Sequence, residues 1–282
     1  TTINCGNLYA CVFERSVNIS NKDNIGMIVQ LPISCTDRMK EAQIILEKRN
    51  SWIYTFDDRP GKLFDNLQHI RATIFLTKSS NNKENKVFTS KYIRWYSETR
   101  NTVFETLEVV PMTKVKNIIS LPKLGSKLSF NIIQRINGKS LAKSILSDRG
   151  NNGVYVHNAP QYFTRITTFQ PHFWNEIDGE KLSVSVKEYK VSDKKYKESL
   201  AAVLNSNIFY LWFILLSDCR HLNKREIENF PIGELSNAAI SSLSQLCTRL
   251  MEDYERKKYR RSAYLKVSGN VEYNEYYPKL SK

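Results

Sequence analysis

The side chains best suited to chemistry lie in one loop, Asp57–His69 (DDRPGKLFDNLQH). The apolar runs on either side, Trp52–Phe56 and Arg71–Lys78, predict two strands that return beside each other. An aromatic ring beside cationic donors is a combination that can hold an unstacked nucleic-acid base. The aromatic ring of the loop is Phe64, and donors for phosphates or base edges come from Arg59, Lys62, His69 and Arg71.

Each feature of this loop also has a plainer interpretation. Phe64 is equally suited to plugging the core beneath the loop, and loop charges are usually just solvated. The adjacent carboxylates of Asp57 and Asp58 resemble an acid/base or metal dyad, but such a pair at the end of a strand is more often a cap. We therefore expect no catalytic residue in the loop.

Three later segments carry side chains that could contact nucleic acid. Tyr155–Arg165 combines aromatics with groups suited to base edges, Lys187–Lys197 is a basic stretch with interleaved tyrosines, and Asp218–Arg225 returns polar donors. For the first segment the alternative is that alternate residues pack in the core, and for the second it is an ordinary solvated face. The basic segment Arg256–Arg261 is either a backbone clamp or a frayed helix end. The candidate DNA-binding residues of the three segments are Asn158, Gln161, Arg165, Lys187, Lys190, Lys194, Lys195, Arg220, Lys224 and Arg225.

The charge of the chain favours a polyanionic partner. Lys and Arg number 42 against 28 Asp and Glu, which gives a formal net charge of +14 and a pI of about 9.5. Double-stranded DNA is the first partner to consider, because such a field attracts phosphates. A composition rich in Lys and Asn for other reasons is the alternative.

Cysteine and histidine usage indicates no metal site and no disulfide framework. The five cysteines form no C-x-x-C pair, and His157, His172 and His221 lack metal spacing. Free cysteines fit a reducing cytoplasm. The longest apolar run, Ile208–Leu216, is far shorter than the roughly 20 residues of a membrane span, so no membrane association is expected.

Hydrophobic periodicity predicts the elements that must position these residues. The first part alternates a helix over Asn7–Ile19, a buried strand over Met27–Leu31 and a helix over Arg38–Lys48, which is typical of an α/β fold. A solvated turn over Ser79–Lys86 and a helical period over Lys91–Leu107 follow. From about Leu121 shorter segments indicate a second, irregular domain, with helices over Phe130–Asn137, Tyr196–Leu216 and Ser236–Lys258.

A family resemblance is carried by three runs: GMIVQLPISCTDRMKEAQIILEK, FDDRPGKLFDNLQHIRATIFLTK and LAAVLNSNIFYLWFILLSDCRHLNKREIENFPI. They resemble the adenine-specific DNA methyltransferases of restriction–modification systems (type IIG) whose catalytic motif is Asn-Pro-Pro-Tyr/Phe. The resemblance implies the late part of the catalytic sheet over residues 1–110, an irregular α+β target-recognition domain over 111–235, and a C-terminal helix and basic tail over 236–282. It places Phe64 where the family packs an aromatic on the extruded adenine.

The family's catalytic and cofactor motifs are missing from these residues. No Asn-Pro dipeptide occurs, and no glycine-bearing cofactor loop precedes the first run. The resemblance therefore implies a DNA-reading part that takes S-adenosylmethionine binding and catalysis from a methyltransferase half in the same chain or another one. The alternative is a stand-alone DNA-binding specificity module without enzymatic activity.

Overall fold

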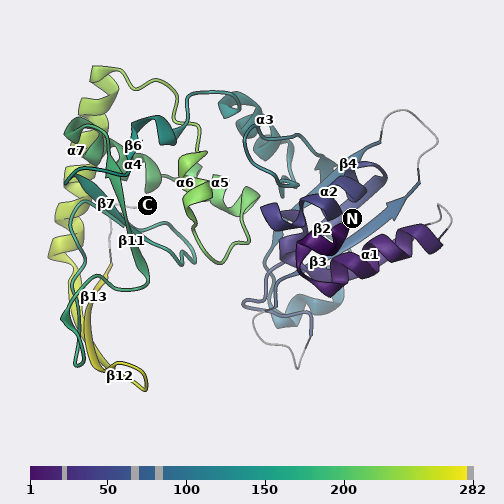
Figure 1. Cartoon of the computed structure of the whole chain (residues 1–282), viewed down its shortest axis with the longest axis horizontal. Coiled ribbons are helices and arrows are strands. Elements are labelled where there is room, and N and C mark those ends of the chain that lie inside the picture. The colour runs from purple at the N-terminus through teal and green to yellow at the C-terminus, as the bar shows by residue number, and fades with distance from the viewer. Residues whose placement is uncertain (21–23, 65–69, 80–84, 278–282) are drawn as a thin grey trace. The chain divides into compact units, whose positions relative to one another are not determined.

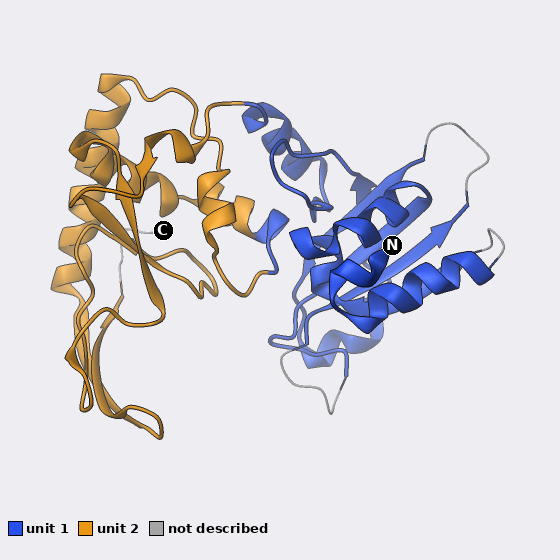
Figure 2. Cartoon of the chain, in the orientation of Figure 1, with its two compact units in different colours: residues 1–138, 214–218 blue, residues 139–213, 219–282 orange. Residues whose placement is uncertain are grey.

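The computed structural model describes residues 1–20, 24–64, 70–79 and 85–277. These residues form two compact units: unit 1 comprises residues 1–138 and 214–218, and unit 2 comprises residues 139–213 and 219–282 (Figure 2). Both contain helices and sheets, which confirms the predicted mixed α/β class. His69 and most of the predicted turn Ser79–Lys86 lie outside the described residues.

Unit 1 is built on a five-stranded mixed sheet with the order β1-β3-β2-β4-β5 (Figure 1). β3 is antiparallel to both β1 and β2, β4 is parallel to β2, and β5 is antiparallel to β4. The predicted strands on either side of the loop are therefore neighbours, as expected. The bounds are α1 Leu8–Ile19, β1 Ile25–Gln30, α2 Lys40–Glu47, β2 Asn50–Phe56, β3 Ala72–Lys78, β4 Val87–Ile93, β5 Val109–Pro111 and α3 Lys127–Ile136.

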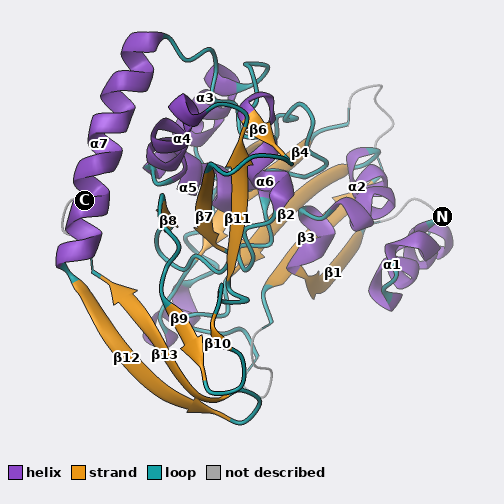
Figure 3. Ribbon diagram, turned by 60° about the vertical axis from the view of Figure 1, so that its left-hand side comes forward, coloured by secondary structure: helices purple, strands orange, loops and turns teal. Residues whose placement is uncertain are grey.

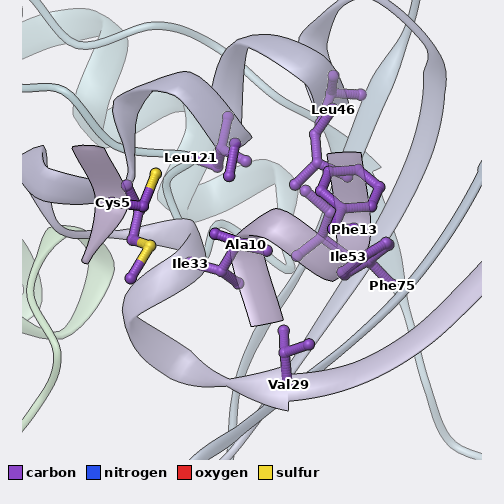
Figure 4. Packing of buried hydrophobic residues seen from close by; sticks show 12 residues of the cluster. Cys5, Ala10, Phe13, Val29, Ile33, Leu46, Ile53, Phe75 and Leu121 are labelled. Carbon is purple, nitrogen blue, oxygen red and sulfur yellow. The ribbon is translucent and has the colours of Figure 1, made fainter. Parts of the chain in front are cut away.

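The main core of unit 1 lies between the sheet and its first two helices (Figure 4). Asn7 caps α1, and the helix turns Ala10 and Phe13 inward, where the Phe13 ring meets that of Phe75 edge-on at 4.7 Å. Leu46 of α2 and Ile53 of β2 belong to the same cluster. This packing fixes β2 and β3, and with them the two ends of the loop between these strands.

Two sequence predictions in unit 1 were wrong. Lys91–Leu107 was expected to be helical, but Lys91–Ile93 belongs to β4 and Ser97–Thr102 is a 3-10 turn. Tyr92 and Ile93 are both buried, so this strand lacks the alternation that marks a one-sided strand. Met27–Leu31 was expected to be buried, yet β1 is an edge strand, and the side chain of Ile28 is 54% exposed.

Unit 2 combines two four-stranded sheets with helices (Figure 3). The strand orders are β6-β11-β7-β8 and β10-β9-β13-β12, and all strand pairs are antiparallel. The bounds are β6 Leu146–Ser147, β7 Gly153–His157, β8 Ile166–Thr167, β9 Phe173–Asn175, β10 Gly179–Glu180, β11 Val186–Val191, α4 Lys197–Leu204, α5 Asn207–Leu216, α6 Lys224–Glu228, α7 Asn237–Arg256, β12 Lys258–Leu265 and β13 Gly269–Tyr276.

The single helix predicted over Tyr196–Leu216 is broken in two. Asn205 turns its side chain onto both backbone groups of Ile166, and Ser206 caps α5 through the amide of Phe209. These side-chain bonds offer the backbone an alternative to continuing the helix. No single described helix has the length and apolar composition of a membrane span; Lys194–Leu204 and Asn207–Leu216 meet that test only as a pair, bent by 68°.

At the end of the chain, the predicted helix is confirmed, and of the two interpretations of the basic segment after it the frayed helix end was wrong. α7 ends at Arg256, within the predicted Ser236–Lys258. The segment from Lys258 is not a frayed helix end, because β12 and β13 pair over eight residues each.

Candidate nucleic-acid interface

The loop after β2 is held against β4 by backbone bonds. The Asp57 amide donates to the Ile93 carbonyl at 2.9 Å, and the Gly61 amide donates to the Trp95 carbonyl at 2.8 Å. A Cβ at Gly61 would lie 2.8 Å from that carbonyl oxygen, so the close approach requires glycine. The loop therefore has a defined path through its described part, residues 57–64.

A buried ion cluster anchors the start of this loop. Asp57 Oδ2 accepts a bond from Arg94 Nε at 2.8 Å, and its Oδ1 lies 3.3 Å from Arg71 Nε. Asp58 Oδ1 lies 3.2 Å from the same nitrogen. Burial raises the pKa of Asp57, but its bonds with Tyr92, Asp58 and Arg94 and the charge of Arg71 outweigh burial and hold that pKa below its usual value.

Leu63, rather than Phe64, fills the space beneath the loop. Leu63 packs against the buried cluster of Phe56, Ile93, Trp95 and Val103. The Phe64 side chain is 38% exposed, so its ring is accessible at the surface of unit 1. Leu63, and not Phe64, is therefore the residue that packs in the core beneath the loop.

The cationic residues of the loop are in different situations. Arg59 is exposed and lies 3.9 Å from Asp58, and Lys62 is half-buried. Arg71 is engaged with the two aspartates and, through Nη1, with the Asp218 carbonyl at 3.4 Å. Arg71 is therefore a structural anchor of the loop in this structure, while His69 lies outside the described residues.

In unit 2, a cavity of about 630 Å³ collects lysines from three separate parts of the sequence. Lys187 and Lys190 come from β11, Lys224 from α6 and Lys143 from the 3-10 turn Ala142–Ile145. The first three were candidates from sequence, whereas Lys143 was missed because only the fold brings it to β11. We call this set of four the lysine groove.

Acidic residues offset part of the charge of the lysine groove. Lys224 Nζ lies 3.4 Å from Glu228 and 3.5 Å from Asp148, and these carboxylates, Glu228 foremost, raise the Lys224 pKa. Glu188 also lines the groove. Among the described residues, no ion pair joins Lys143, Lys187 or Lys190 to an acid. The groove thus presents three ammonium groups to a partner.

A capping box places Lys224 at the start of α6. The Asn223 side chain accepts from the Glu226 amide, and the Glu226 carboxylate accepts from the Asn223 amide at 3.0 Å. Glu226 is buried, which raises its pKa, although Arg225 at 2.8 Å opposes that shift. Arg225 is therefore committed to Glu226, while Arg220 is exposed.

The segment Tyr155–Arg165 is partly structural. The Asn158 amide group donates to the Val184 carbonyl at 3.4 Å, and Gln161 is exposed while its carbonyl accepts from Tyr210 at 2.7 Å. The Arg165 guanidinium lies over the Tyr276 ring at 5.8 Å, and burial lowers its pKa. Burial, assisted by Arg165, also lowers the pKa of His157 to about 4, so this histidine is neutral near pH 7.

The two other basic candidates lie at the end of β11. Lys194 and Lys195 are exposed in the 3-10 turn Lys194–Tyr196, and Lys195 Nζ is 3.5 Å from Asp193. Neither lines the lysine groove. In the described ranges, no group of three or more His, Cys, Asp or Glu residues is arranged to hold a metal ion.

Comparison with protein-family models and with curated protein sequences finds no match to this chain.

Replacing Leu63 by Ala should cost about 1–2 kcal/mol of unfolding free energy, because half-buried contacts with the Phe56 cluster are lost. Phe64→Ala should cost less than about 1 kcal/mol, since the ring is partly exposed. Urea denaturation of both variants measures this difference. A larger loss for Phe64→Ala than for Leu63→Ala would contradict the assignment of Leu63 as the core residue.

Asp57→Asn should lower the unfolding free energy at pH 7 by on the order of 3 kcal/mol, because Arg71 and Arg94 lose their buried carboxylate. The folded-state pKa of Asp57 is depressed, so its contribution is present above the unfolded pKa of about 3.9 and is lost as the pH falls below it. Denaturant titrations at pH 7, 5 and 3 should show that the difference in unfolding free energy between wild type and variant becomes smaller towards pH 3. A difference in unfolding free energy that stays the same at all three pH values would contradict a stabilising role for the charge of Asp57.

Proposed function

We propose that this chain is the DNA-reading part of a site-specific adenine-N6 methyltransferase. The lysine groove carries the DNA part of the proposal: Lys187 and Lys190 meet Lys224 and Lys143 on one concave surface, although the sequence separates them. Ammonium groups gathered in this way grip consecutive phosphates, and the release of counterions makes such binding strong at low salt. The net charge of +14 acts in the same direction.

The methyltransferase part of the proposal rests on the family resemblance, and the loop of unit 1 supports it. A base-modifying enzyme needs an accessible aromatic on a loop of fixed path, so that an extruded base finds a prepared stacking surface. Phe64 is partly exposed, and the described loop around it is fixed by Asp57, Gly61 and Leu63. Phe64 is accordingly proposed to stack on the extruded adenine.

S-adenosylmethionine and the catalytic motif are proposed to come from a methyltransferase half in the same chain or another one. Unit 1 leaves room for such a half on its sheet. Among the described residues β1 pairs with β3 alone, and Ile28 and Leu76, on adjacent strands, are 54% and 52% exposed. Unpaired strand edges with exposed apolar side chains are usually covered in natural proteins.

The second candidate is a DNA-binding specificity module with no enzymatic role. This candidate also binds DNA through the lysine groove. It requires neither base stacking by Phe64 nor a partner that covers the edge strand β1. A base-modification assay with a reconstituted catalytic half separates the two, because only the methyltransferase part loses function on Phe64→Ala.

The double variant Lys187→Gln/Lys190→Gln should bind duplex DNA more weakly and with a smaller salt dependence. Each lost phosphate contact lowers the slope of log K against log salt by about 0.9, so the slope should fall by about two. Fluorescence anisotropy with a mixed-sequence duplex between 50 and 300 mM NaCl measures it.

Lys40→Gln/Lys86→Gln is the matched control, since it removes the same charge from exposed sites in unit 1. Equal slopes for the two double variants would attribute the effect to net charge alone. Wild-type binding without salt dependence would refute DNA as the partner of the groove.

Titration calorimetry of the chain alone with S-adenosylmethionine should show no binding, because the proposal assigns that site to the other half. Saturable heat with one site per chain would overturn this assignment. A matched titration of the reconstituted enzyme provides the positive control.

A further inference from the structure

The last two strands of unit 2 form a ribbon, Lys258–Tyr276, whose turn end is held beside the β9–β10 hairpin by hydrogen bonds between Asn270 and Glu176 (Figure 3). β13 pairs with β9 only over Val271–Tyr273, and within the described residues the outer edge of β12 is unpaired. All eight residues of β12 are exposed. At about 3.3 Å per residue the ribbon extends about 26 Å.

The two faces of the ribbon differ. Ala263 and Leu265 line a cavity of about 400 Å³ together with Val271 and Tyr273, so this face of the ribbon is turned towards the rest of unit 2. Successive side chains of a strand point to opposite faces. The other face of β12 therefore carries a row of hydrogen-bond donors: Lys258, Arg260, Ser262 and Tyr264.

The tip of the ribbon is apolar and exposed. Tyr264 is 71% and Val267 87% exposed, and Leu265 between them is half-exposed. Exposed apolar side chains gathered at one point mark an interaction site more often than single ones do. The tip therefore has the composition of a surface that a partner covers.

The ribbon carries a small excess of positive charge, which favours an anionic partner. Four basic and two acidic residues lie between Lys258 and Tyr276. Both acids are already paired, Glu272 with Arg260 at 3.5 Å and Glu275 with Arg261 at 2.8 Å. One of the four basic residues, Lys266, lies at the turn beside Val267, and Glu176 of unit 2 accepts hydrogen bonds from Asn270 near the same turn.

We infer that the ribbon is a second contact to duplex DNA, with the apolar tip, Tyr264–Val267, seated in a groove and the donors of β12 directed at phosphates and base edges. A two-stranded ribbon fits the major groove, and apolar side chains pack against base edges and between base steps. This inference rests on the proposed binding of DNA by the lysine groove. It adds a contact made by burial of apolar surface, which releases no counterions.

The double variant Tyr264→Ser/Val267→Ser tests it. Both side chains are exposed, so folding should be unaffected, and thermal unfolding confirms this. The variant should bind a mixed-sequence 30-base-pair duplex about tenfold more weakly, with the slope of log K against log salt unchanged. The matched control is Leu8→Ser/Leu128→Ser, since these apolar residues of unit 1 are 82% and 70% exposed and should leave the affinity unchanged.

The outcomes separate the inference from the function on which it rests. If the wild type binds duplex DNA and Lys187→Gln/Lys190→Gln weakens it, but the tip variant binds like the wild type, the ribbon has no role. A tip variant that loses binding to anionic phosphatidylserine vesicles or single-stranded RNA while keeping duplex affinity would assign the tip to that other partner. A wild type that does not bind duplex DNA overturns both proposals.

Discussion

The buried carboxylate of Asp57 is the constraint on which unit 1 depends most. A carboxylate that is 4% exposed must be compensated, and the compensation comes from Arg71 at the start of β3 and Arg94 after the end of β4. One side chain thus ties together the ends of three neighbouring strands. Because those ends begin and finish the loop, the same interaction fixes where the loop enters and leaves the sheet.

This anchoring explains how a polar loop can hold an aromatic at the surface. Gly61 lets the chain approach Trp95 closely, and Leu63 fills the gap above Phe56 and Val103. With those positions satisfied, the Phe64 ring has no buried site to occupy.

Unit 2 uses electrostatics differently. Its buried acids are paired locally, Glu226 with Arg225 and the capping box of α6, and Asp253 with Lys257. In the proposed complex with DNA, the groove would contribute salt-sensitive attraction, and the apolar tip of the ribbon would contribute contact area that salt does not weaken. Two contacts of different physical origin would let one chain approach DNA quickly and remain bound.

The sequence by itself determined the elements with a strong local signal. The helix over Asn7–Ile19, the strands on both sides of the loop and the helix over Ser236–Lys258 follow from period and caps, because such signals involve residues close in the chain. It also identified Lys187, Lys190 and Lys224 individually. The tertiary structure decided the features that depend on distant partners: that Lys91–Ile93 is a strand beside β2, that Arg71 serves Asp57, and that Leu63 rather than Phe64 is packed. It also decided that Lys143 joins the groove and that the basic end of the chain is a ribbon, because pairing across the fold leaves no local trace.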